Sequence, residues 1–262
     1  MTPFIIAEFG CCHDGDLEKA RRLVWQAFSA GANAAKGQFW SSPKRLADRR
    51  RAPDAEAAYE RYRMPAGWLG DLAEWCWRDG LEFMTTCYLL EDLPTVAPFV
   101  TRWKIASFEA QDLDFVCAHK PFGKQTIVST GLCGGEALGQ LQEFKDSHFG
   151  QWDIRLLHCI SAYPTPVDQA NLRAIRDFGL DGFSDHTTSV LTGALAVAAG
   201  ATIIEKHLRL DETDPANPDY GHSLPPDQFA LYVQNIRLAE AAMGDGLRSD
   251  AERPWSRFVV RP

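Results

Sequence analysis

The chain has 262 residues, of which 45% are hydrophobic, and it carries a formal net charge of -8 with a pI near 5.4. This length fits one large domain with a sizeable core, and the acidic balance argues against a nucleic-acid-binding surface, which needs a basic face. The N-terminus lacks the pattern of a signal peptide and no apolar run approaches the ~20 residues of a membrane span, while an odd number of cysteines, seven, indicates free thiols in a reducing, cytoplasmic setting.

Short apolar, β-branched or aromatic runs recur along the chain, and a segment of helical length follows each of them. The expected strands are Phe4–Phe9, Ala34–Phe39, Leu81–Thr86, Arg102–Ser107, Thr126–Thr130, Ile154–Ser161, Gly182–His186 and Thr202–Leu208. Strand–helix alternation implies right-handed crossovers and a parallel sheet, and eight strands are what a closed parallel barrel needs. The sequence therefore predicts an α/β fold, a (β/α)8 TIM barrel over residues 1–247, followed by a C-terminal tail over residues 248–262.

Two intervening segments show the apolar spacing of amphipathic helices. Asp16 is placed to cap a helix over Leu17–Ala30, whose apolar positions are Leu23, Val24, Ala27 and Phe28. A second stripe precedes the third strand and is interpreted as core; it consists of Trp68, Leu69, Leu72, Trp75 and Cys76.

Polar residues stand at the carboxyl end of nearly every expected strand. They are Glu8, Lys36, Gln38, Thr85, Thr86, Lys104, Ser107, Ser129, Thr130, His158, Ser161, Asp185, His186, Glu205 and His207. A single serine or threonine commonly caps a strand, but two lysines, two glutamates and three histidines are costly to bury unless they pair or bind something. Because these strand ends converge on one face of a barrel, where barrel active sites lie, the pattern predicts an active site there.

The same residues carry a resemblance to the N-acetylneuraminate (sialic acid) synthase family. The matching motifs are Ile5–Gly15, Ala30–Gln38, Lys104–Ser107, Val128–Gly131, Leu157–Cys159, Tyr163–Pro166, Ser184–Thr187, Ile204–His207 and Ser223–Pro225. Their order and spacing agree over nearly the whole chain. The resemblance implies a homodimeric transferase that condenses phosphoenolpyruvate with an amino-sugar aldehyde, forming a carbon–carbon bond and releasing phosphate.

The resemblance also implies roles for individual residues. Lys36 and Lys104 are similar in position to the family's cationic anchors, which places phosphoenolpyruvate between them. The other substrate-binding candidates are the hydroxyl donors Thr86, Ser107, Ser129 and Ser184, together with Gln38, Ser161, Tyr163 and Asp219. Tyr163 and Asp219 would contact sugar hydroxyls, although a loop tyrosine and a turn aspartate are common without such a role.

Three carboxylates are further catalytic candidates beside Lys104. Glu8 and Glu109 could hold a metal-bound water or orient the acceptor. Glu205 has either a direct role or the role of a buried ion-pair partner. His158 stands in a matching motif, and we interpret it as a structural hydrogen-bonding residue.

His186 and His207 resemble the two metal ligands of the family. A divalent ion can polarise an aldehyde oxygen, and the family implies manganese (Mn²⁺) or magnesium (Mg²⁺), although imidazole ligands would also admit zinc, iron or cobalt. Cys12, or else Cys11, could reach the ion, as a cysteine does in the related octulosonate phosphate synthases. The alternative is that Cys12 fills the space of the family's asparagine, and the two matching histidines favour it.

The chain ends about where the family's antifreeze-like C-terminal domain would begin, and in relatives that domain lends an arginine to the partner subunit's sugar site. A cover for the barrel mouth is therefore expected from a local loop or a neighbouring subunit. The candidate is Trp40–Met64, with Arg61 and Arg63 at the acceptor; an ordinary solvated connection with one helix is the alternative. The run Arg49–Arg51 within it is interpreted as solvated, because acidic residues flank it.

Two other functions stay open. One is a metal-dependent pyruvate aldolase, which the two phosphate-binding lysines argue against. The other is a catalytically silent barrel that binds a sugar phosphate, which the histidine pair argues against. The identity of the acceptor sugar is open as well.

Overall fold

The structure, a computed structural model, describes residues 2–244 and contains a closed barrel of eight parallel strands in chain order. The strands are β1 Phe4–Gly10, β2 Ala34–Phe39, β3 Glu82–Cys87, β4 Arg102–Ile105, β5 Gln125–Ser129, β6 Ile154–Cys159, β7 Gly182–Asp185 and β8 Ile203–His207. Because β8 pairs with β1, the sheet has no free edge. The predicted (β/α)8 barrel is confirmed. The predicted tail, residues 248–262, lies outside the described residues.

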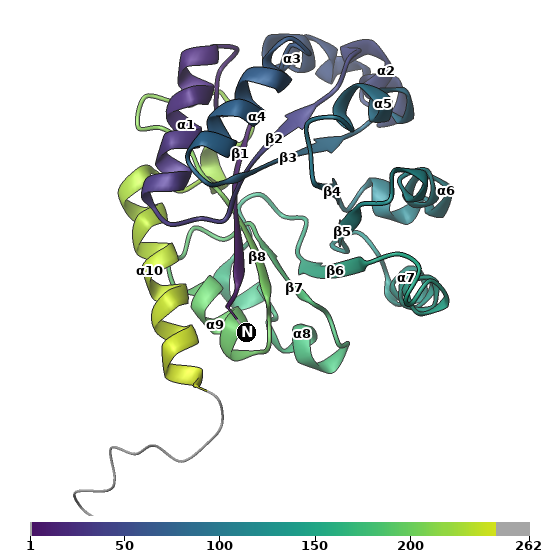
Figure 1. The fold of residues 1–262 in the computed structure, drawn as a ribbon, viewed down its shortest axis with the longest axis vertical. Helices are drawn as coiled ribbons and strands as arrows, with labels where there is room; N and C mark the ends of the chain where they lie inside the picture. Colours follow the sequence, from purple (N-terminus) through teal and green to yellow (C-terminus); the bar gives the residue numbers. More distant parts are fainter. Residues whose placement is uncertain (1, 245–262) are drawn as a thin grey trace, which may run out of the picture.

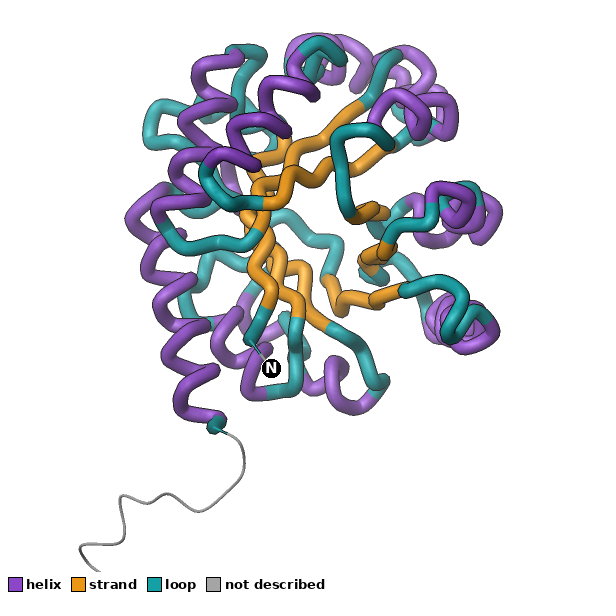
Figure 2. Tube along the Cα trace, in the orientation of Figure 1, coloured by secondary structure: helices purple, strands orange, loops and turns teal. Residues whose placement is uncertain are grey.

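Helices surround the strands, as Figure 2 shows. They are α1 Leu17–Ser29, α2 Pro43–Arg49, α3 Glu56–Arg61, α4 Trp68–Arg78, α5 Leu93–Val96, α6 Leu113–Cys117, α7 Gly135–Ser147, α8 Arg173–Asp177, α9 Thr192–Ala198 and α10 Pro226–Met243. The last of them, α10, packs against α9 on the outside of the barrel (Figure 1). In the part of the chain that the structure describes, no helix is long and apolar enough to cross a bilayer.

The two helical stripes lie largely as predicted. The side chain of Asp16 caps α1 by accepting from the backbone N–H groups of Glu18, at 2.8 Å, and Lys19, at 3.2 Å. The side chain of Phe28 is 46% exposed, because it lies about 100° round the helix from Ala27, at the edge of the buried face. The stripe on α4 belongs to the core, where its two tryptophans are partly buried.

Alternation along the strands places an apolar layer inside the barrel and a polar layer directly above it. The apolar layer is one cluster of residues from six strands: Ile6, Ala34, Met84, Ile127, Leu157 and Ile203. Side chains two positions further along a strand point to the same face, and there the residues are Glu8, Lys36, Thr86, Ser129, Cys159 and Glu205. The apolar layer thus closes the barrel beneath the polar one.

The segment 40–64 is anchored at the barrel mouth and is not a simple solvated connection. It contains α2 and α3, two helices where the simpler alternative expected one. A small apolar cluster lies under it, formed by Cys11, Trp40, Leu46, Tyr62, Tyr88 and Leu89. The indole N–H of Trp40 also donates to the carbonyl of Tyr59 at 3.0 Å. These contacts hold the segment over the carboxyl ends of the first strands.

Candidate active site

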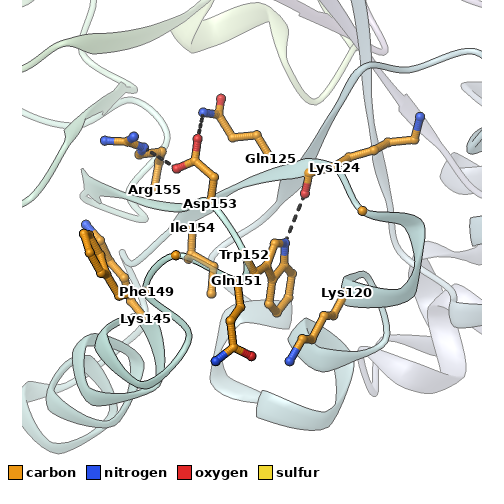
Figure 3. Close-up of a pocket in the computed structure, with 12 residues that line it drawn as sticks. Lys120, Lys124, Gln125, Lys145, Phe149, Gln151, Trp152, Asp153, Ile154 and Arg155 are labelled. Atoms are coloured by element: carbon orange, nitrogen blue, oxygen red, sulfur yellow. Dashed lines mark hydrogen bonds and ion pairs between the residues drawn. The ribbon is translucent and has the colours of Figure 1, made fainter.

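Two cavities lie at opposite ends of the barrel, and only one has the position of an active site. The cavity in Figure 3 lies where β5 and β6 begin, between Trp152 and several basic side chains. Two of these, Lys145 and Arg155, are already paired with Asp181 at 2.7 and 3.2 Å. Barrel enzymes carry their active sites at the carboxyl ends of the strands. We therefore assign the candidate site to the other cavity.

That cavity, of about 440 Å³, opens at the carboxyl ends of the strands. It brings together all predicted site residues except Glu109. They are Glu8, Lys36, Gln38, Thr86, Lys104, Ser107, Ser129, Ser161, Tyr163, Ser184, His186, Glu205, His207 and Asp219. Arg50, Tyr88, Cys159 and His222 are among the further lining residues, and none of them was predicted from the sequence.

The floor of the cavity is a buried network of two lysines and two glutamates. Lys36 forms an ion pair with Glu8 and lies 3.6 Å from an oxygen of Glu205. Lys104 lies 3.5 Å from the other oxygen of Glu205. The carboxylate of Glu205 thus faces both ammonium groups, which supports its predicted role as an ion-pair partner.

Hydroxyl groups complete the surroundings of the two lysines. Lys36 donates to Thr86 at 3.0 Å, and Lys104 donates to Ser129 at 2.8 Å. Ser184 donates to Glu205 at 2.8 Å. The hydroxyl of Ser161 is buried at the cavity without a partner. Two cations with several hydroxyls around them can hold a phosphate or a carboxylate.

The two glutamates of the network have opposite electrostatic environments. Burial raises the pKa of Glu8 from 4.5 to about 7, against the lowering effect of Lys36. Burial would also raise the pKa of Glu205, but the charges of Lys104 and Lys36 outweigh it and lower this pKa to about 2. Near neutral pH Glu205 is therefore ionised, whereas Glu8 can gain or lose a proton.

Three histidine rings face one another beside this network. The ring centroids of His186 and His207 lie 5.5 Å apart, and His222 lies 4.4 Å from His207 and 5.8 Å from His186. A hydrogen bond of 2.9 Å joins Nδ1 of His186 to the carbonyl of Ile160. The ring of Tyr163 covers His186 at a centroid distance of 4.3 Å.

The histidines fit a metal ion. Nδ1 of His207 and Nε2 of His222 are buried without a hydrogen-bond partner. Burial lowers the pKa of both rings, that of His222 to about 4, so both are neutral and carry a free lone pair. The contact of 3.7 Å between His222 and Asp219 is therefore not an ion pair. Unpartnered neutral imidazoles are the donors that divalent transition metals use.

Glu109 does not line the cavity, and its role at a metal-bound water or at the acceptor stays a prediction. It is completely buried, and its two oxygens accept from Nη2 of Arg50 at 3.1 and 3.4 Å. Arg50 reaches the cavity instead, with its guanidinium over the rings of Tyr88 at 4.6 Å and Phe108 at 5.4 Å. The interpretation of Arg50 as solvated rested on the acidic residues that flank it in the sequence. That interpretation was wrong, because in space the arginine contacts the buried Glu109 and two aromatic rings.

The two arginines that were predicted to reach the acceptor, Arg61 and Arg63, lie elsewhere. Arg61 pairs with Asp214 and is largely exposed. Arg63, just beyond the end of α3, pairs with Glu60 of that helix at 3.2 Å. Neither lines the cavity.

Cys11 and Cys12 both support Asp219 and the loop that carries it. The backbone N–H of Cys11 donates to Oδ2 of Asp219 at 2.9 Å, and its thiol lies 3.3 Å from the same oxygen. Cys12 is fully buried with its sulfur 3.6 Å from the Ser223 hydroxyl. Burial raises the pKa of both thiols well above the usual value. The packing role is thus favoured for Cys12.

This architecture, a closed barrel with a charged, histidine-containing cavity at its carboxyl face, defines a (β/α)8-barrel enzyme. The chain belongs to the NeuB family, whose model matches residues 23–248. It is 34% identical to an N,N'-diacetyllegionaminic acid synthase of Legionella pneumophila, over 100% of this chain and 79% of that protein. It is 36% identical to a pseudaminic acid synthase of Campylobacter jejuni, over 93% of this chain and 75% of that protein.

A solved structure agrees with these matches. The N-acetylneuraminic acid (sialic acid) synthetase of Leptospira borgpetersenii, in complex with citrate, superimposes with a TM-score of 0.88 at 28% identity, covering 98% of this chain and 91% of that one. The predicted family resemblance and the prediction of an enzyme of this kind are confirmed.

Proposed function

We propose that the chain condenses phosphoenolpyruvate with an aldehyde sugar, releasing phosphate and forming a sialic-acid-like 2-keto-3-deoxy sugar acid. The observation that supports this most is the pair of buried lysines with hydroxyl partners, Lys36 and Lys104, beside three histidines in one cavity. Relatives named acid synthases support the reaction class. In this reaction C3 of phosphoenolpyruvate forms a bond to the aldehyde carbon, and the aldehyde oxygen takes up a proton to become a hydroxyl. Water adds to C2 and the phosphate leaves from the same carbon as inorganic phosphate, so that C2 becomes the ketone.

In this proposal the lysine side of the cavity binds phosphoenolpyruvate. Lys104 with Ser129, and Lys36 with Thr86, hold the phosphate and carboxylate by fixed charges and hydroxyl groups. Glu205 already faces both lysines, so the bound anion shares these cations with it. Glu205 therefore limits the net positive charge around the two lysines before the anion binds, and it keeps both lysines in place.

The histidine side of the cavity binds the acceptor. His186 and His207 would hold a divalent ion, manganese or magnesium by resemblance, which would supply polarisation of the aldehyde oxygen. Glu8, with a pKa of about 7, can exchange a proton with the acceptor near neutral pH. The cavity also presents sugar-contacting groups, those of Gln38, Tyr163 and Asp219. By the same resemblance we expect a cytoplasmic homodimer, and sedimentation velocity tests the dimer.

Arg50 lines the cavity, and we propose that its positive charge contacts the acceptor, in the way proposed for the segment 40–64. We expect Arg50→Ala to raise the acceptor KM roughly tenfold to hundredfold, the effect of losing about 1.5–3 kcal/mol from a charged hydrogen bond, and to leave phosphoenolpyruvate binding unchanged. Steady-state kinetics with each substrate varied in turn measures this. Arg61→Ala, which removes an exposed arginine of the same segment, is the matched control. Equal acceptor KM values in both variants would contradict the assignment.

The proposed reaction is tested by phosphate release from phosphoenolpyruvate with manganese and a panel of aldoses, each product being identified by mass. Phosphate release that depends on one aldose supports the synthase. Turnover of free pyruvate without phosphoenolpyruvate would show the aldolase instead. Binding of sugar phosphates without any turnover would show the silent barrel.

A further inference from the structure

A third histidine and a carboxylate lie beside His207, one of the two predicted metal ligands. Candidate ligand atoms of His207, Asp219 and His222 all lie within 4.8 Å of one another. All three residues are buried, with exposed fractions of 6%, 9% and 2%. Of the three, only His207 was predicted from the sequence to bind a metal.

The two imidazoles have no other partner that would explain their placement. Nδ1 of His207 and Nε2 of His222 are buried and make no hydrogen bond. A buried polar atom without a partner is unfavourable, and here two such atoms lie in one group with a carboxylate. Their arrangement is explained if an ion binds among them.

The loop after β8 holds His222 in place. The backbone N–H of Leu224 donates to the carbonyl of His207 at 2.9 Å, and the N–H of Arg209 donates to the carbonyl of Leu224 at 3.0 Å. These bonds bring the returning chain against the end of β8, with Leu208 and Leu224 paired as an isolated bridge. His222 is thus fixed beside His207 by backbone bonds.

Asp219 is oriented in a similar way. Its Oδ2 accepts from the backbone N–H of Cys11 at 2.9 Å, while its Oδ1 lies 3.7 Å from Nε2 of His222. The backbone N–H of Asp219 donates to the side-chain oxygen of Asn217 at 3.0 Å. One carboxylate oxygen is therefore bonded to the protein and the other faces the histidines.

We propose that His222 and Asp219 join His207 as ligands of the divalent ion, and that Asp219 takes this role in place of the sugar contact expected from the sequence. With His186, whose ring centroid lies 5.5 Å from that of His207, the ion is held by three imidazoles and one carboxylate. The inference rests on the proposed function in one respect, the presence of an ion at His186 and His207. Three imidazole ligands favour zinc, iron, cobalt or manganese strongly over magnesium, which prefers oxygen ligands. The site therefore selects a transition metal, and fewer positions remain for water and acceptor than with two protein ligands.

Metal affinity tests this independently of turnover. Metal-free full-length protein is titrated with zinc and with cobalt in competition with a chromophoric chelator, and magnesium is titrated separately. We expect His222→Ala to weaken zinc and cobalt binding by more than about 100-fold, because even residues that only support a ligand contribute about 10–100-fold. Asp219→Asn should weaken both by at least about tenfold. His148→Ala, at the end of α7, removes a histidine far from this cavity and should change neither.

The visible spectrum of bound cobalt distinguishes a residue that binds the ion from one that only lines the cavity. The visible absorption of the cobalt-loaded protein should change in wavelength and intensity in His222→Ala and in His222→Gln, because both lose an imidazole ligand. Thermal unfolding of the metal-free variants should match the parent, and the rise in Tm on adding zinc should be smaller than in the parent. If one of the two His222 variants is unstable without metal, the cobalt spectrum of the other variant still shows whether His222 binds the ion.

Unchanged zinc affinity and an unchanged cobalt spectrum in both His222 variants would overturn the inference, as would a parent protein that binds no transition metal. Failure of the proposed function looks different. A parent that binds zinc through His222 but releases no phosphate from phosphoenolpyruvate with any aldose would disprove the condensation and leave the metal site standing.

Discussion

Replacing His207 with alanine is expected to remove the metal ion and to lower kcat by about 100-fold to 10,000-fold, since a Lewis-acid ion contributes several kcal/mol to the transition state. His207 is 6% exposed and lies between the rings of His186 and His222. Its Nδ1 makes no hydrogen bond. Replacing His207 with alanine therefore breaks no hydrogen bond of Nδ1, and the expected loss of activity comes from the loss of metal binding.

Metal content and turnover are both measured for this variant. Elemental analysis of purified protein gives the metal, and phosphate release with the active aldose gives kcat. Chelation of the parent enzyme should abolish turnover, and added manganese should restore it. His148→Ala is the control histidine variant and should keep both metal and turnover. A His207→Ala protein with undiminished metal and kcat would remove this residue from the metal site.

Lys104→Met is expected to weaken phosphoenolpyruvate binding about tenfold to hundredfold, corresponding to about 1.5–3 kcal/mol for one charged contact. Lys104 is 2% exposed, donates to Ser129 at 2.8 Å and faces Glu205 at 3.5 Å. Methionine keeps most of the side-chain volume and removes the charge. The variant also leaves Glu205 with Lys36 as its remaining cation, which adds repulsion toward an anionic substrate.

The binding of phosphoenolpyruvate to this variant is measured by calorimetry without acceptor, so that turnover does not interfere. Lys44→Met, on the exposed face of α2, is the control for loss of a lysine charge. We expect a larger Kd for phosphoenolpyruvate in Lys104→Met alone, and a smaller change in the acceptor KM. Equal affinity in the parent and in Lys104→Met would refute the placement of the phosphate at the lysine side of the cavity.

The sequence by itself determined the barrel and most of the polar lining of its mouth. Strand-like runs that alternate with helical segments are local patterns, and a parallel barrel brings all carboxyl ends of its strands to one face. Residues such as Lys36, Ser129 and Glu205 could therefore be assigned to one site before any contact was known. Each sits on a strand, where position along the chain fixes both depth and direction.

Only the tertiary structure decided which of these groups pair and which loop residues join them. Arg50 looked solvated because its neighbours in sequence are acidic, yet its partner Glu109 is 59 positions away in the chain. His222 lies on a loop without periodicity, and the bonds between Leu224 and the end of β8 bring it to His207. Loop conformations depend on long-range contacts that no local pattern encodes. Strand residues were therefore predicted from the pattern, loop residues such as Tyr163 and Asp219 only from the family resemblance, and Arg50 and His222 were missed.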